Sequence, residues 1–245
     1  MLTLKQALGL TDLQKAFDTY SLSFNGTDES VTIDSMVGTL NPLEGSVSLW
    51  CKLDTVSASG NLFRTRVDGS NYINVLYHAS SNQMRFAYKA GGTLKTAVFS
   101  DAIENDGLWH HVVGTWSSSS DEIKIYLDGT LKATTTGLGT WSGTLVDADL
   151  GQNLTGGGFY KGKMSNVALF NTVLSLANVQ YIQNRSNAVA TRFYPMDITN
   201  MSGLKAYYRL GLGSGTVALD SSGNGNNGTL VNTPTWSTTT PTYNN

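Results

Sequence analysis

An Asp-Gly pair between two strand-like segments is the feature that most constrains how this chain can fold. Residues 123–127 alternate apolar and more polar side chains, which is the period of a strand with one buried face. Asp128-Gly129 follows directly, and a second alternating segment covers residues 130–136. A type I′ turn needs positive φ at both central positions, which Asp and Gly tolerate. The sequence therefore predicts an antiparallel hairpin here.

Similar short segments with turn residues between them fill the chain from residue 20 to about residue 170. Strands are expected at 46–53, 62–66, 72–77, 83–89, 109–116, 148–151 and 162–170, and two short strands flank Asn25-Gly26. Many short strands with regular turn signals predict an all-β antiparallel sandwich or jelly roll. The single cysteine, Cys51, excludes an internal disulfide. It shares one strand face with apolar residues, so we expect a buried thiol.

The two ends depart from this strand pattern. Residues 1–19 contain two short amphipathic stretches and predict a helical arm, which packs on its own domain or docks on a partner. Residues 20–185 form the predicted sandwich, 186–203 a connector and 204–245 a C-terminal strand segment. A short helix is expected after the N-cap residue Ser175, with Leu176, Val179 and Ile182 on one face.

Charge and hydropathy narrow the classes of partner. The net charge is −2 and the 16 Lys and Arg residues are scattered, which argues against nucleic-acid binding. No run of 18 apolar residues occurs, so no membrane span is expected. The N-terminus lacks the basic start and apolar core of a signal peptide. We therefore expect synthesis in the cytoplasm without classical export.

Four segments together resemble the laminin G-like jelly rolls of the concanavalin A-like superfamily. They are 20–33 (YSLSFNGTDESVTI), 46–53 (SVSLWCKL), 109–129 with its WHHVVGTW and IKIYLDG motifs, and 159–179 (FYKGKMSNVALFNTVLSLANV). Residues 206–230 resemble the segment that normally opens such a domain, yet here they come last. This segment completes its own sandwich, is donated to a neighbouring subunit, or is a truncated repeat. The first two are favoured, because an isolated strand pair is not stable.

The superfamily resemblance raises the question of catalysis. Its glucanase members carry paired carboxylates in an E-x-D-x-E pattern, as glycoside hydrolysis requires. Glu29, Glu44, Glu104 and Glu122 are the only glutamates, and none lies in that pattern. The three histidines lack the spacing of a zinc site. No catalytic residue is therefore assigned, and the chain is expected not to be an enzyme.

Two kinds of binding site remain open. The resemblance implies a Ca²⁺ ion at the sandwich rim, for which Asp220, Asn224 and Asn226 are weak candidates; Asx turns are the alternative use of these residues. The family's acidic pair is replaced here by Ser165-Asn166, which weakens the calcium hypothesis.

Loop aromatics are the candidates for a glycan site. They are Trp141, Phe159, Tyr160 and Trp236, with structural packing as the favoured alternative.

The functional expectation follows from the resemblance rather than from a catalytic motif. Domains with a comparable C-terminal segment resemble bacteriophage structural proteins. We therefore expect a non-enzymatic virion surface protein, a head decoration or appendage subunit. Its terminal segments would attach it to capsid or other virion proteins, as a homo-oligomer such as a trimer. The alternative is a carbohydrate-binding or adhesion module that recognises a host-surface glycan, with or without calcium.

Overall fold

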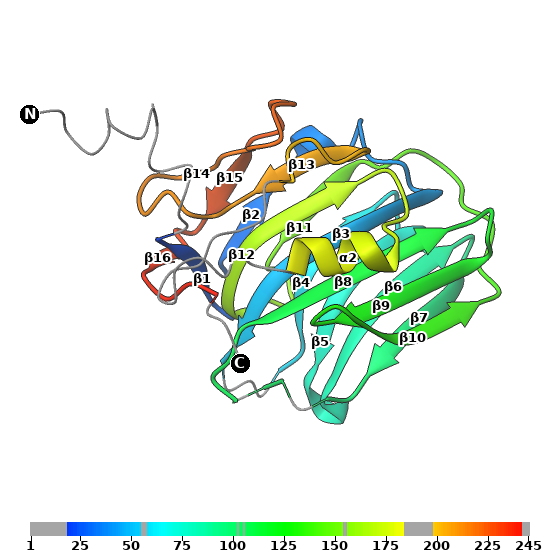
Figure 1. Cartoon of the computed structure of the whole chain (residues 1–245), viewed down its shortest axis with the longest axis horizontal. Coiled ribbons are helices and arrows are strands. Elements are labelled where there is room, and N and C mark those ends of the chain that lie inside the picture. Colours follow the sequence, from blue (N-terminus) through cyan, green and yellow to red (C-terminus); the bar gives the residue numbers. More distant parts are fainter. Residues whose placement is uncertain are drawn as a thin grey trace, which may run out of the picture.

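Two antiparallel sheets of eight strands each pack face to face in the computed structural model (Figure 1). The structure describes residues 19–54, 58–101, 103–104, 106–153, 156–183 and 198–241. The predicted all-β antiparallel sandwich is confirmed. The predicted N-terminal arm, apart from residue 19, and most of the predicted connector lie outside the described residues.

Sheet A contains β1 (Ser21–Asn25), β3 (Glu44–Leu53), β8 (His110–Ser117), β9 (Glu122–Leu127), β10 (Thr130–Thr136), β12 (Lys161–Phe170), β13 (Leu204–Tyr208) and β16 (Thr235–Ser237). Sheet B contains β2 (Ser30–Thr32), β4 (Gly60–Arg66), β5 (Tyr72–His78), β6 (Gln83–Ala90), β7 (Thr93–Phe99), β11 (Asp147–Leu150), β14 (Val217–Ala218) and β15 (Gly228–Val231). The order in sheet A is β10-β9-β8-β3-β12-β1-β16, with β13 also on β12, and in sheet B β14-β15-β2-β11-β4-β5-β6-β7. Two 3₁₀ turns, η2 (Asp34–Met36) and η3 (Ala79–Ser81), complete the loops.

The Asp-Gly hairpin forms as the sequence predicts. β9 pairs with β10 in antiparallel register, with Leu127 opposite Thr130. Asp128 has φ 47° and Gly129 has φ 77°, which are the two positive values that a type I′ turn needs. The hairpin forms one end of sheet A.

The two strands around Asn25-Gly26 do not pair with each other. β1 lies in sheet A and pairs with β12 and β16, whereas β2 lies in sheet B between β11 and β15. Asn25 Oδ1 accepts hydrogen bonds from the backbone N–H groups of Thr27 (2.7 Å) and Asp28 (3.2 Å). This Asx turn carries the chain across the sandwich from one sheet to the other.

The core lies between the inner faces of the two sheets. Cys51 and the three apolar residues that share its face of β3, Val47, Leu49 and Leu53, are all buried there. The predicted buried thiol is confirmed, and burial raises its pKa above the usual range. Gly114 of β8 leaves room for a ring from the other sheet, since a Cβ at this position would lie 2.4 Å from Phe86 Cδ2.

Helix α2 (Leu176–Gln183) lies across the outer face of sheet A (Figure 1). Ser175 Oγ accepts a hydrogen bond from the Asn178 N–H at 3.2 Å, which confirms the predicted N-cap. Of the three residues predicted on one face, Val179 and Ile182 are buried against the sheet, whereas Leu176 in the first turn is 48% exposed. In the described ranges, no helix is long and apolar enough to cross a membrane.

The C-terminal segment adds strands to both sheets of its own chain. β13 pairs with β12, and β1 pairs with the same strand nearer its start. β15 pairs with β2, and β16 pairs with β1 at the edge of sheet A. Tyr208 and Leu230 from this segment are buried in the central core. The last part of the sequence therefore supplies both layers of the sandwich.

Candidate functional site

The outer face of sheet B carries an ordered set of polar side chains, which we call the polar outer face. Because strand residues alternate between faces, Ile73, Val75 and Tyr77 of β5 point into the core, whereas Tyr72, Asn74 and Leu76 point outward. The register aligns Asp149 with Arg64 and Arg64 with Asn74 across three strands. The polar outer face comprises Asn61, Arg64, Arg66, Tyr72, Asn74, Arg85, Lys89, Asp147 and Asp149.

Asp149 is a buried carboxylate in this face, with 4% of its surface exposed. Its Oδ2 accepts a hydrogen bond from Gln152 Nε2 at 2.8 Å. Its Oδ1 is buried and accepts no hydrogen bond of good geometry within the described part of the chain. Burial raises the pKa of Asp149, and the nearby Thr32 and Gln152 side chains oppose this only in part. An unused buried acceptor of this kind costs free energy unless a ligand or water satisfies it.

Asn74 repeats the pattern at the centre of the sheet. It is 4% exposed, and its Nδ2 donates to Asn61 Oδ1 at 2.8 Å, while Asn61 Nδ2 donates to the Gly158 carbonyl at 2.9 Å. Asn74 Oδ1 is buried and has no partner among the described residues, and the same holds for Asn153 Oδ1 in the adjoining loop. Among the described residues, three buried acceptor atoms that receive no hydrogen bond of good geometry thus lie in or beside one sheet face.

Cationic groups lie beside these acceptors. Arg64 Cζ lies 4.0 Å from the centroid of the Tyr72 ring, and Lys89 Nζ lies 5.7 Å from the same centroid. Arg66 forms an ion pair with Asp147, with Nη2 and Oδ2 3.0 Å apart. Burial lowers the pKa of Arg64. The face therefore combines acceptors, guanidinium donors and an aromatic ring, which are the groups that bind polyhydroxylated ligands.

The four aromatic candidates from the sequence are not gathered in one place. Trp141 is half-buried and packs on Tyr88 with ring centroids 5.4 Å apart. Trp236 lies on β16, where its Nε1 donates to the Gly215 carbonyl at 3.2 Å. Phe159 is half-buried beside the start of β4. The structure favours packing roles for Trp141 and Trp236.

Tyr160 requires a correction. It is 1% exposed, and its ring packs edge-on against Phe24 at 5.8 Å. Its hydroxyl lies 2.9 Å from the Lys52 carbonyl and 3.0 Å from the Lys163 carbonyl, to which it donates. A ring held this way is not available to a glycan, because it is buried against Phe24 and its hydroxyl is bound to backbone carbonyls.

The calcium candidates form a self-contained loop. Asp220 Oδ1 accepts hydrogen bonds from the N–H groups of Tyr207 and Ser222, both at 2.9 Å, and its Oδ2 accepts from Ser222 Oγ and from the Asn226 N–H. Asn224 and Asn226 donate their Nδ2 groups to the Lys205 carbonyl. This donor set does not fit a calcium ion, since both carboxylate oxygens are already used. The Asx-turn alternative explains these residues.

Other metal chemistry finds no support in the described residues. Within those ranges, no three His, Cys, Asp or Glu side chains come together in a way that could hold a metal ion. Ser165 and Asn166, which replace the acidic pair that the resemblance would supply, are buried and hydrogen-bond to each other at 2.8 Å.

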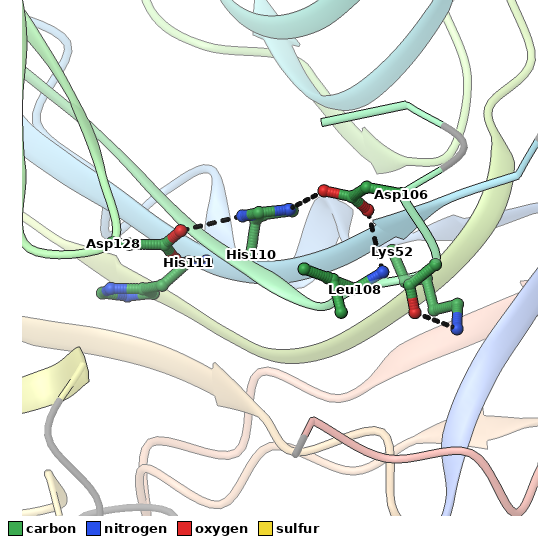
Figure 2. Close-up of polar contacts among 7 residues, drawn as sticks. Lys52, Asp106, Leu108, His110, His111 and Asp128 are labelled. Carbon is green, nitrogen blue, oxygen red and sulfur yellow. Dashed lines mark hydrogen bonds and ion pairs between the residues drawn. The ribbon is translucent and has the colours of Figure 1, made fainter. Parts of the chain in front are cut away.

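A histidine held between two carboxylates lies at the hairpin end of sheet A (Figure 2). His110 Nδ1 lies 2.8 Å from Asp128 Oδ2, and its Nε2 lies 2.7 Å from Asp106 Oδ2. Asp128 Oδ1 also accepts a hydrogen bond from the His111 N–H. Because both ring nitrogens face acceptors, the protonated imidazolium satisfies both contacts. Asp128 therefore fixes the hairpin turn and the start of β8 together.

These contacts shift the pKa values of the group in opposite directions. Burial by itself would lower the pKa of His110, but the hydrogen bonds to Asp128 and Asp106 outweigh it and raise that pKa. Burial would raise the pKa of Asp128, but the hydrogen bonds from His110 and the His111 N–H outweigh it and lower that pKa. His111 points elsewhere: it is buried, stacks on Trp50 at 5.1 Å and contacts Ser48 Oγ at 2.8 Å.

We predict that replacing His110 by Gln removes part of the pH dependence of stability. Because the pKa of His110 is raised in the folded protein, protonation of His110 stabilises the fold. This stabilisation is complete below the pKa of an unfolded histidine, about 6.5, and is lost as the pH rises through the pKa of His110 in the folded protein. The lowered pKa of Asp128 gives stabilisation above about pH 4 that is lost on acidification. Urea unfolding at pH 5.5 and 8.5 should show a loss of about 1–2 kcal/mol for His110→Gln at the lower pH and a smaller loss at the higher pH.

The control for this experiment is His78→Gln. His78 Nδ1 contacts the Ser80 and Ser81 hydroxyls of the adjacent 3₁₀ turn, and no carboxylate of the described residues forms an ion pair with it, so this variant should keep the wild-type difference between the two pH values. An equal loss at both pH values for His110→Gln would contradict the prediction.

Two packed antiparallel sheets with a helix on the outer face of one define a jelly-roll β-sandwich. Residues 25–180 match the laminin G-like family model described as the concanavalin A-like lectin/glucanases superfamily. The chain belongs to this superfamily, and the family resemblance seen in the sequence is confirmed. Its name covers both lectins and glucanases, so membership alone does not decide between binding and hydrolysis.

The proteins that the chain is similar to include a C-reactive protein, a putative carbohydrate binding protein and a pentraxin. The chain is 28% identical over 170 residues to C-reactive protein 1.1 of Limulus polyphemus, covering 65% of this chain and 69% of that protein. A putative carbohydrate binding protein from Bacteroides ovatus has a similar structure, with TM-score 0.62 and 17% identity over 90% of this chain and 60% of that chain. The heptameric SAP-like pentraxin of Limulus polyphemus gives TM-score 0.53 and 19% identity over 74% of this chain and 89% of that chain. At these identities the structures support the fold alone.

Proposed function

We propose that the chain is a non-catalytic carbohydrate-binding module and that its ligand lies on the polar outer face of sheet B. The observation that carries the proposal is a pair of buried acceptor atoms, Asp149 Oδ1 and Asn74 Oδ1, which receive no hydrogen bond of good geometry within the described part of the chain. Sugar hydroxyls donate to such acceptors, and the neighbouring Tyr72 ring supplies an apolar surface. The relationship to pentraxins and to a carbohydrate-binding protein supports this alternative rather than a virion role.

The absence of a catalytic pair in the sequence supports a binding role over hydrolysis. Glu122 is engaged by Lys124 on β9, and Glu29 Oε2 accepts a hydrogen bond from the Asn25 N–H at 2.7 Å. These two glutamates lie on different loops and strands, so they do not flank a common bond. Virion attachment, capsid partners and a trimeric assembly stay predictions from the sequence.

We predict that Asp149→Asn weakens glycan binding. The substitution keeps the shape of the side chain and replaces one buried acceptor by an amide, so it should cost about tenfold in affinity through one lost hydrogen bond. The measurement is a glycan array with neutral and acidic oligosaccharides, followed by calorimetric titration of the best ligand.

The matched control is Asp101→Asn. Asp101 is an exposed residue that forms an ion pair with Lys132, so its substitution should leave affinity unchanged. Saturable binding of an oligosaccharide that Asp149→Asn does not weaken would move the site away from this face. Failure of the wild-type protein to bind any saccharide on the array would refute the proposed function itself.

A further inference from the structure

We infer that the saccharide bound at the polar outer face carries a negatively charged group and that Arg64 binds this group. The inference rests on the proposed function and adds the class of ligand. It starts from an imbalance on the face: Arg64 is held rigidly there, yet no Asp or Glu of the described residues forms an ion pair with it, whereas its neighbour Arg66 is paired with Asp147.

The Arg64 side chain is held in place by its surroundings. Its guanidinium lies 4.0 Å from the Tyr72 ring centroid, a cation–π geometry that fixes the plane of the group. Its Nε is buried and donates to no acceptor in the described part of the chain. A guanidinium fork that is already oriented loses little conformational entropy when it binds a carboxylate or sulfate in a bidentate manner. Arg64 therefore has the geometry of an anion-binding group.

The charges around Arg64 favour an anion. The whole chain has a net charge of −2, yet cations prevail on the polar outer face. Its cations are Arg64, Arg66, Arg85 and Lys89, and its carboxylates are Asp147 and Asp149. Lys89 lies near the same ring, with its Nζ 5.7 Å from the Tyr72 centroid and 2.8 Å from the Gly69 carbonyl oxygen, to which it donates.

The position of Asp149 predicts a second feature of the ligand, a hydroxyl group close to its acidic group. Asp149 is opposite Arg64 in the register of β11 and β4, and residues opposite each other in a sheet have Cβ atoms about 4.5–5.5 Å apart. The Asp149 carboxylate instead accepts a hydrogen bond from Gln152, and Asp149 and Arg64 do not form an ion pair with each other. One sugar ring with an acidic substituent and a hydroxyl group spans such a distance. The ligand class is thus an acidic saccharide, bound by its charge at Arg64 and by a hydroxyl group at Asp149.

The test compares acidic oligosaccharides with their uncharged parents. The probes are hexuronate oligomers, sialylated oligosaccharides and sulfated oligosaccharides, each beside its neutral counterpart, against the full chain and its Arg64→Gln variant. Wild type should prefer at least one acidic probe by about tenfold or more, and the preference should fall with added salt. Comparison of the carboxylated and sulfated probes identifies which anion is recognised.

The Arg64→Gln variant should reduce this preference to about twofold or less while it retains binding to the neutral parent. Lys124→Gln is the control, because Lys124 lies on β9 in the other sheet and forms an ion pair with Glu122 there; it should keep the wild-type preference. Equal binding of acidic and neutral probes, or a preference that survives Arg64→Gln, would overturn the inference and leave the proposed function standing. Absence of binding to every saccharide would overturn both. Thermal unfolding of each variant checks that it is folded.

Discussion

Replacement of Trp116 by Ala should destabilise the sandwich by about 3–5 kcal/mol, because it opens a large cavity between the two sheets. Trp116 of β8 is fully buried, and its ring packs 6.1 Å from that of Phe86 on the opposite sheet. Its Nε1 donates to the Asn41 carbonyl at 3.2 Å, which ties the loop before β3 to the core. Gly45 accommodates the indole, since a Cβ there would lie 2.3 Å from Trp116 Cζ2. Urea unfolding measures the loss.

Trp141→Ala is the comparison variant for this measurement. Trp141 is only half-buried and packs on the margin of the same core, so its truncation should cost clearly less than that of Trp116. The same variant should leave oligosaccharide affinity unchanged, because Trp141 does not belong to the polar outer face. A similar loss of stability for both tryptophans would contradict this description of the core.

Removal of residues 204–245 should abolish cooperative folding. The deletion takes away β13, β14, β15 and β16, and with them the partners of β12, β2 and β1. It also removes core side chains such as Tyr208. The exposed strand edges and apolar surface should make the truncated chain aggregate. Circular dichroism and size-exclusion chromatography of the truncated chain test this expectation.

Adding the missing segment as a separate chain provides the control for the deletion. Co-expression of residues 204–245 with residues 1–203 should restore a soluble complex, because the strand pairs do not require a covalent link. A truncated chain that unfolds cooperatively and stays monomeric by itself would show that the segment is not needed for the sandwich.

Local sequence patterns were sufficient to predict most strands of this fold. Alternation located β3, β6, β9 and β10 to within two residues, and the Asp-Gly pair fixed the hairpin. The pattern did not predict β7, where the apolar Leu94 is exposed and the polar Lys95 is half-buried. At this edge strand the alternation of burial does not follow the alternation of residue type, so the period-2 signal is lost.

The candidate site was harder to predict than the fold. The sequence suggested loop aromatics, whereas the polar outer face is made of strand residues such as Arg64, Asn74 and Asp149. Alternating polar residues, as in R-T-R at 64–66 and D-A-D at 147–149, were the available signal, but an ordinary solvated strand face has the same pattern. What sets these residues apart is tertiary: the loop that approaches Asn61 through Gly158 and the buried acceptors next to it.

The adjacency of β1 and β16 has a consequence for how the protein is made. β1 is the first described strand to leave the ribosome, and its edge partner β16 is the last. β2 likewise pairs with β15, which lies much later in the sequence. Pairing between such distant parts of a chain is slow, since the entropy of closing the loop must be overcome before the contact stabilises anything. The sandwich therefore closes only after residues 228–237 have been translated, and until then the edges of β1 and β2 lack these partners.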